Sequence, residues 1–154
     1  MASNVLSLSD MTTRPENTVW TTSAMSYDVH LQRFREQEPQ LVRSPQVWAL
    51  LERAWEAPPD DLGYSRVTWH GDEADLYTEQ PGDPIDGLMF SRAGRRVYDL
   101  IYRLAVAGDF VIIPPDCGPF LVDERQQSHL PQELTADAVV VGSGEELARL
   151  IESA

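Results

Sequence analysis

The pattern that most constrains the fold is a helical stripe followed at once by a buried strand, within residues 97–113. Apolar residues recur there at intervals of three and four, which marks one face of an α-helix: Val97, Leu100, Ile101, Leu104 and Ala105. The sequence predicts that this helix begins at Ser91 or Arg92 and that Gly108 follows its last turn. The continuous apolar run 110–113 indicates a central strand with both faces covered.

Alternation of apolar and polar residues predicts strands elsewhere in the chain. Tyr27, Val29 and Leu31 alternate with polar residues, and residues 66–70 do the same. A turn at 71–73 follows, which predicts a hairpin. Further strands are expected at 74–78, 86–90, 120–122 and 138–141, the last of them buried, and one or two helical turns are expected at 123–130.

Two capped segments predict the remaining helices. Ser44 is a good N-cap, and Pro45 occupies the first helical position, where its missing N–H costs nothing. The apolar stripe of this helix consists of Val47, Leu50, Leu51, Ala54 and Trp55. Ser143 and Glu146 fit a capping box, in which each side chain accepts a hydrogen bond from an unpaired backbone N–H at the start of a terminal helix.

These elements predict an α/β fold of the α+β type in a single domain. We expect a mixed, mostly antiparallel sheet of about five to seven strands with three helices packed on it. The 154 residues are enough for one domain, which we assign to residues 25–154. Residues 1–24 are expected to form a disordered leader, with Met25 as an alternative start of the chain. The other interpretation is an ordered arm that docks through Val19 and Trp20.

The excess of acidic residues limits the classes of molecule that the protein is expected to bind. All 12 basic residues are arginine, and 25 acidic residues give a formal net charge of −13. Such a surface repels phosphate, so neither nucleic acid nor a membrane is an expected partner. A single cysteine fits a reducing cytoplasm, and no stretch has the features of a membrane span or a signal peptide. The absence of lysine beside abundant Ala, Arg and Pro is typical of a GC-rich bacterial genome.

Much of the negative charge lies in one stretch of the chain. Between Glu56 and Asp86 there are nine acidic residues and one basic residue, Arg66. This predicts a docking face that attracts a basic protein partner through its summed field. The carboxylates are expected to line an exposed sheet edge or its turns without individual arginine partners, and the partner-binding residues are Asp72, Glu73, Asp75, Glu79, Asp83 and Asp86. The alternative is a solvated surface that protects edge strands from aggregation.

One loop offers the residues for a second class of function. Cys117 lies in a proline-rich loop after the predicted central strand, and His129 is the histidine nearest to it in sequence. A thiolate nucleophile needs such a base. Asp116, however, is expected to raise the pKa of the thiol, which opposes its activation. An ordinary turn cysteine is therefore the favoured interpretation.

The sequence predicts no metal or cofactor. One cysteine and three scattered histidines give no zinc pattern, and the acidic middle lacks the spacing of a calcium loop. His30 and His70 lie in alternating strands, where exposed histidines are expected, although the two could meet across a sheet. Gly142 and Gly144 precede a helix as in a phosphate cradle, but the acidic residues that follow would repel phosphate. Arg92, Arg95 and Arg96 are expected to form a basic cluster on a helix. They could hold an anion, but the favoured interpretation is that they offset the acidic surroundings and pair with carboxylates.

Three segments resemble a group of small uncharacterised acidic bacterial proteins. They are residues 25–34, 86–90 and 139–147, and the resemblance spans most of residues 25–154. Proteins of this group are similar in size and acidity to immunity proteins of bacterial toxin systems. The resemblance implies no catalytic residues.

The leading hypothesis is therefore a non-enzymatic, cytoplasmic binding protein that neutralises or regulates a basic protein, such as a toxin domain. The alternative is a small enzyme or ligand-binding domain that uses the Cys117 loop with His129. A third interpretation is a scaffold with no electrostatic target.

Overall fold

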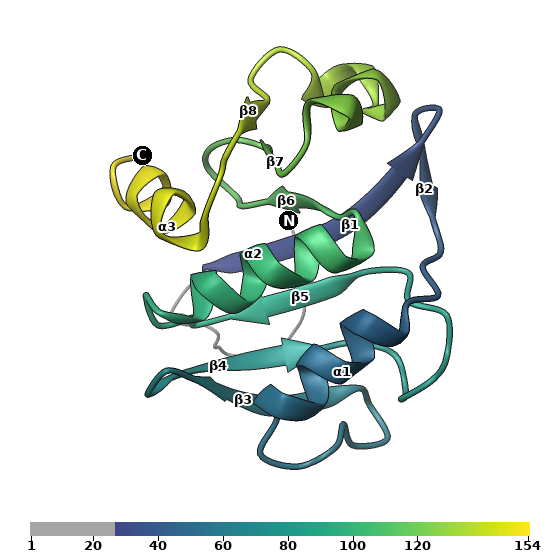
Figure 1. The fold of residues 1–154 in the computed structure, drawn as a ribbon, viewed down its shortest axis with the longest axis vertical. Helices are drawn as coiled ribbons and strands as arrows, with labels where there is room; N and C mark the ends of the chain where they lie inside the picture. Colours follow the sequence, from purple (N-terminus) through teal and green to yellow (C-terminus); the bar gives the residue numbers. More distant parts are fainter. Residues whose placement is uncertain (1–26) are drawn as a thin grey trace, which may run out of the picture.

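The computed structural model describes residues 27–154, so the predicted leader and the alternative start at Met25 lie outside the described residues. Within residues 27–154, three α-helices pack on one sheet of eight strands that are mostly antiparallel (Figure 1). The predicted α+β class is therefore confirmed.

The order of strands across the sheet is β3-β4-β5-β1-β6-β7-β8, and β2 pairs with the second half of β1. Only β7 and β8 are parallel among the described pairs. The strands are β1 (Asp28–Arg35), β2 (Glu38–Gln40), β3 (Tyr64–Trp69), β4 (Asp72–Tyr77), β5 (Leu88–Ser91), β6 (Val111–Ile113), β7 (Phe120–Leu121) and β8 (Val139–Val140). The helices are α1 (Pro45–Ala54), α2 (Val97–Gly108) and α3 (Gly144–Glu152), with two 3₁₀ helices, η1 (Glu124–His129) and η2 (Gln132–Leu134).

Strand β2 is an element that the sequence did not predict. It follows a tight turn in which Glu36 and Gln37 both have positive φ, 50° and 69°. Neither residue is the Gly or Asn that such turns favour, so the sequence carries no hairpin signal there. The turn is held from outside, because His129 accepts hydrogen bonds from both backbone N–H groups, at 3.0 Å each.

The local signals for α1 and α3 are confirmed. The Ser44 Oγ accepts a hydrogen bond from the Val47 N–H at 3.2 Å, and Pro45 begins the helix. In α3 the Ser143 Oγ accepts from the Glu146 N–H at 3.0 Å. The Glu146 carboxylate accepts in turn from the N–H of Gly142 at 2.7 Å, one residue before the position in a standard capping box.

The predicted boundaries of α2 are wrong at both ends. Ser91 still belongs to β5, where it pairs with Asp28 of β1, and Arg92 has a positive φ of 55° that no α-helix contains. The helix therefore begins at Val97. At the other end, Gly108 is the last helical residue, and Asp109 adopts the left-handed conformation with φ 60°.

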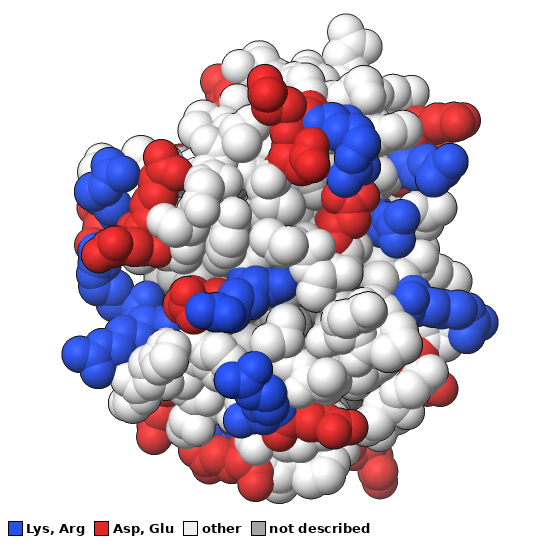
Figure 2. All heavy atoms as spheres, in the orientation of Figure 1, with Lys and Arg blue, Asp and Glu red and all other residues white. Residues whose placement is uncertain are grey.

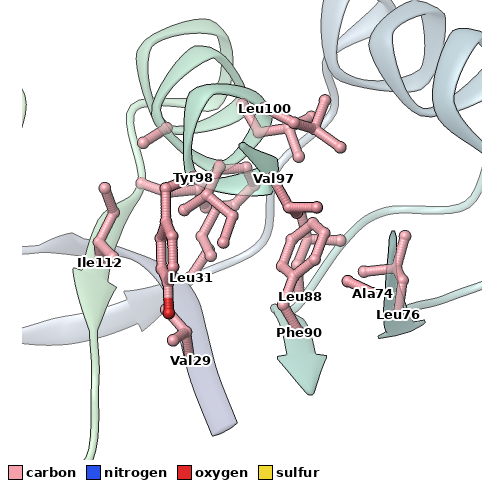
Figure 3. Packing of buried hydrophobic residues seen from close by; sticks show 14 of the residues in the cluster. Val29, Leu31, Ala74, Leu76, Leu88, Phe90, Val97, Tyr98, Leu100 and Ile112 are labelled. Atoms are coloured by element: carbon pink, nitrogen blue, oxygen red, sulfur yellow. The ribbon is translucent and has the colours of Figure 1, made fainter. Parts of the chain in front are cut away.

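The main core lies between the sheet and α2 (Figure 3). Side chains of β1, β4 and β5, including Leu31, Leu76 and Phe90, point from the sheet toward this helix. The predicted core residues Leu100, Ile101, Leu104 and Ile112 are all fully buried there.

Two residues that were expected to be buried in the core with α2 do not lie there. Val111 is buried, but in a smaller cluster with Leu121 and Leu130. Val140 is 44% exposed, so its predicted burial is wrong. The reason is that β8 is a two-residue strand at the edge of the sheet, and the neighbouring Val141 is buried instead.

Among residues 27–154, the face of the sheet opposite α2 is covered at one end only. The smaller cluster lies under η1 and η2 at the β6–β7 end, where Leu130 and Leu134 pack against the sheet. On β3 and β4, the residues that alternate with the core residues stay half-buried or exposed. Among the described helices, none combines the length and the apolar character needed to cross a membrane.

Candidate partner-binding surface

The acidic residues of β4 are paired within the molecule, contrary to the prediction. Arg66 of β3 forms an ion pair with Glu73 and lies 3.7 Å from the Asp75 carboxylate. Asp75 is only 13% exposed and also accepts a hydrogen bond from the Tyr64 hydroxyl at 2.8 Å. Asp72 accepts from the backbone N–H of Arg96 at 2.8 Å and so fixes the chain before α2. These three carboxylates are therefore already engaged within the molecule.

The other three predicted partner-binding residues lie in the loop after β4. Glu79, Asp83 and Asp86 follow β4, and among residues 27–154 none of them forms an ion pair. Asp83 and Asp86 are exposed, and one carboxylate oxygen of Glu79 is buried without a hydrogen-bond partner. The prediction of unpaired carboxylates thus holds for this half of the set.

A second loop lies beside the first and adds to its charge. Thr78 donates to the Gly63 carbonyl at 2.9 Å, and the Gln80 side chain donates to the Asp60 carbonyl at 2.7 Å. We call residues 57–63 and 78–87 together the acidic loop surface. It carries five acidic residues and no basic residue: Asp60, Asp61, Glu79, Asp83 and Asp86.

The tip of the first loop is rigid and presents an apolar side chain. The Asp60 carboxylate accepts from the N–H groups of Leu62 and Tyr64, at 2.9 and 3.0 Å. Gly63 approaches the second loop so closely that a Cβ would lie 2.2 Å from the Thr78 carbonyl oxygen. Leu62 is 89% exposed between these fixed points, beside Asp61. A rigid loop lowers the conformational entropy that is lost when a partner binds.

The helix-covered face of the sheet has a different charge distribution. Figure 2 shows arginines and carboxylates side by side around a central uncharged area on this face. Carboxylates predominate only toward the lower rim of the view. The helix-covered face therefore offers no extended field of one sign.

The predicted helical cluster of arginines does not form, because residues 92–96 precede α2. The predicted pairing with carboxylates does occur for two of the three arginines. Arg92 lies 3.9 Å from the Asp75 carboxylate, and Arg95 lies 3.5 Å from that of Glu152.

A cleft of about 670 Å³ lies where the β3–β4 turn meets the first turns of α2 and α3. Two of its charged groups already have partners: Arg96 donates to the His70 carbonyl at 2.9 Å, and Asp99 accepts from Trp69 Nε1 at 2.9 Å and Arg103 Nε at 2.8 Å. Partial burial alone would raise the pKa of Asp99, but these two hydrogen bonds outweigh it and lower the pKa below its usual value. Arg96 and Asp99 therefore already contribute to the packing of the elements around the cleft.

The structure does not bring Cys117 and His129 together. The Cys117 Sγ lies 3.8 Å from the hydroxyl of Tyr27, just before β1, whereas His129 accepts from Glu36, just after β1. The eight residues of β1 separate its ends by roughly 26 Å at about 3.3 Å per residue. The nucleophile and base proposed in the enzyme alternative are therefore too far apart to act together.

Cys117 is expected to react slowly with alkylating reagents. Burial raises the pKa of its thiol, and Asp116 adds to this, although the hydrogen bond between Cys117 and Tyr27 opposes it. At neutral pH, iodoacetamide should modify the native protein more slowly than the same protein unfolded in urea, which serves as the control. Faster reaction of the native thiol would contradict this assignment and revive a catalytic role.

The histidines also lie apart from one another. His30 is in β1, and His70 is in the two-residue turn that joins β3 to β4, so β5 lies between the two positions in the sheet. Within residues 27–154, no three His, Cys, Asp or Glu side chains are arranged so that they could hold a metal ion.

Comparisons of the chain with protein-family models, with curated proteins and with solved structures found no match.

Proposed function

We propose that this protein is a non-enzymatic acidic binding protein whose partner is a basic protein, and that it acts as an immunity protein acts on a toxin domain. The observation that carries the proposal is the acidic loop surface, with five carboxylates and no basic residue on two adjoining loops. The partner-binding residues retained from the predicted set are Glu79, Asp83 and Asp86.

The physical basis is long-range attraction followed by docking on a rigid surface. Unpaired carboxylates on one side of a molecule produce a field that draws a cationic protein toward that side. This field mainly raises the association rate, and salt weakens it because the screening length is about 8 Å at physiological ionic strength. Glu73 and Asp75 of β4 contribute less, since their arginine partners cancel much of their field.

The test is capture from a lysate of the source cell with three forms of the protein. The first is the wild type, and the second carries Glu79→Gln, Asp83→Asn and Asp86→Asn. The third is a matched control with the same change in charge at the other end of the sheet: Glu124→Gln, Glu133→Gln and Asp137→Asn. These control residues are all exposed. The control and the changes at Asp83 and Asp86 should hardly alter the unfolding temperature, because exposed charges contribute about 0–1 kcal/mol each. Glu79 is half-buried, so the unfolding temperature of the loop variant is measured before its binding is compared.

We expect the wild type and the control to retain the same protein, with a net positive charge in its sequence. The loop variant should retain about three- to tenfold less of it. Equal retention by all three forms would show that the acidic loop surface is only a solvated surface. Failure of the wild type to retain any basic protein would contradict the proposed function.

A further inference from the structure

A row of large side chains crosses the open face of the sheet, on the side away from α2. The strand registers pair Tyr64 of β3 with Tyr77 of β4, Tyr77 with Met89 of β5, and Met89 with His30 of β1. His30 pairs onward with Ile113, where the covered part of this face begins. We call Tyr64, Tyr77, Met89 and His30 the cross-strand row.

The cross-strand row lies on the surface because its residues alternate with those of the main core. Ala74 and Leu76 of β4 are buried toward α2, so Tyr77 points to the other face, where it is 40% exposed. Tyr64 and Met89 are half-buried and His30 is exposed. The rings of Tyr64 and Tyr77 contact each other, with centroids 5.4 Å apart. Nothing in residues 27–154 covers them on their outer side.

Charged residues lie on both sides of the cross-strand row. On one side they are paired with one another, and on the other side they have no ion-pair partner among residues 27–154. On one side, the register continues through Arg66, Asp75, Ser91 and Asp28, which are linked by ion pairs and hydrogen bonds. On the other side, the chain runs directly from Tyr64, Tyr77 and Met89 into the acidic loop surface. An uncharged strip therefore adjoins carboxylates that no arginine of residues 27–154 neutralises.

We infer that the cross-strand row is the apolar centre of the interface for the basic protein partner, with the acidic loop surface as its charged rim. The inference rests on the proposed function and adds the residues that hold the partner once it has arrived. Interfaces are commonly built in this way, with tyrosine and methionine enriched at the centre and charge at the rim. Tyrosine faces also accept the cationic groups of Arg and Lys and the apolar stems that carry them.

Charge complementarity favours a basic protein at this surface over a second copy of the chain or a nucleic acid. A second copy of the chain would bring two molecules of net charge −13 together at their acidic rims, and a nucleic acid would bring phosphates to the same place. A basic protein instead gains attraction from the unpaired carboxylates and covers the two rings.

Site-specific photo-cross-linking in a lysate of the source cell tests whether the partner contacts the cross-strand row. The photoreactive residue p-benzoylphenylalanine replaces Tyr77 in one form and Val106 in another. Val106 is the matched control, because it is 54% exposed but lies on α2, on the opposite face of the sheet. After irradiation, position 77 should yield an adduct with a protein of net positive charge, and position 106 should yield none. The adduct should be weaker at high salt.

The second measurement uses that basic protein after purification. Tyr77→Ser should raise its dissociation rate by about tenfold or more while leaving its association rate unchanged, because a central aromatic residue holds the bound complex together. The loop variant (Glu79→Gln, Asp83→Asn, Asp86→Asn) should do the reverse and lower mainly the association rate. Val106→Ser should change neither rate.

The outcomes separate the two proposals. If the basic protein cross-links at position 106 and not at 77, or if Tyr77→Ser leaves its dissociation rate unchanged, the cross-strand row is not the interface, although the proposed function stands. An adduct at position 77 with residues 1–26 of the same chain, or with a second copy, would also overturn this assignment. If no basic protein is bound at all, both proposals fail.

Discussion

Replacing Leu104 with alanine is expected to lower the free energy of unfolding by about 2–5 kcal/mol. Leu104 is fully buried on the inner face of α2, in the main core. The substitution removes buried methyl groups and leaves a cavity that the surrounding sheet and helices can fill only in part. Chemical denaturation followed by circular dichroism measures the change.

Val106→Ala in the same helix is the matched control. Val106 is two residues further along α2 and points to solvent, so its truncation should change the free energy of unfolding by less than about 0.5 kcal/mol. Similar losses in the two variants would show that the inner face of α2 has been placed wrongly.

Gly144→Ala is expected to produce the second large loss of stability, by pushing α3 away from α2. A Cβ at position 144 would lie 2.5 Å from the Cα of Asp99 and 2.9 Å from the carbonyl oxygen of Tyr98. Both contacts are with the backbone of α2, which cannot rotate out of the way as a side chain can. Overpacking of this kind costs typically about 1–3 kcal/mol.

Gly142→Ala provides the comparison in the same connection. A Cβ there would meet only the Glu146 carboxylate, at 3.7 Å, so the free energy of unfolding should hardly change. Hydrogen exchange of the α3 amides should report the difference, with faster exchange in Gly144→Ala than in Gly142→Ala. Equal exchange in the two variants would contradict the close approach of α3 to α2.

The elements that the sequence predicted correctly are those with local signals. Ser44 and Pro45 define the start of α1 without reference to the rest of the chain, and the α2 stripe identifies its buried face. The start of α2 was missed because it depends on the pairing of Ser91 with Asp28, which is 63 residues away. Strand β2 was missed for a similar reason, since its turn is held by His129.

The sequence correctly predicted that Glu79, Asp83 and Asp86 have no arginine partner among residues 27–154. It missed the ion pairs of β4 and the cross-strand row, which both depend on the turn between β3 and β4. The sequence placed the turn between β3 and β4 at residues 71–73, whereas the structure has it at His70 and Gly71. The two-residue turn puts Arg66 opposite Asp75 and within reach of Glu73. It also aligns Tyr64 with Tyr77. A shift of a strand register changes every such pair, so a small error in the turn hid both the ion pairs and the cross-strand row.

The association rate of the basic partner, measured over a range of ionic strength, shows whether the acidic loop surface attracts that partner. The wild type should associate fastest at low salt, and its rate should fall steeply as salt screens the acidic loop surface. The loop variant should start from a lower rate and fall less, whereas the control variant with Glu124, Glu133 and Asp137 neutralised should follow the wild type closely. Identical rates and identical salt dependence for the wild type and the loop variant would contradict the account.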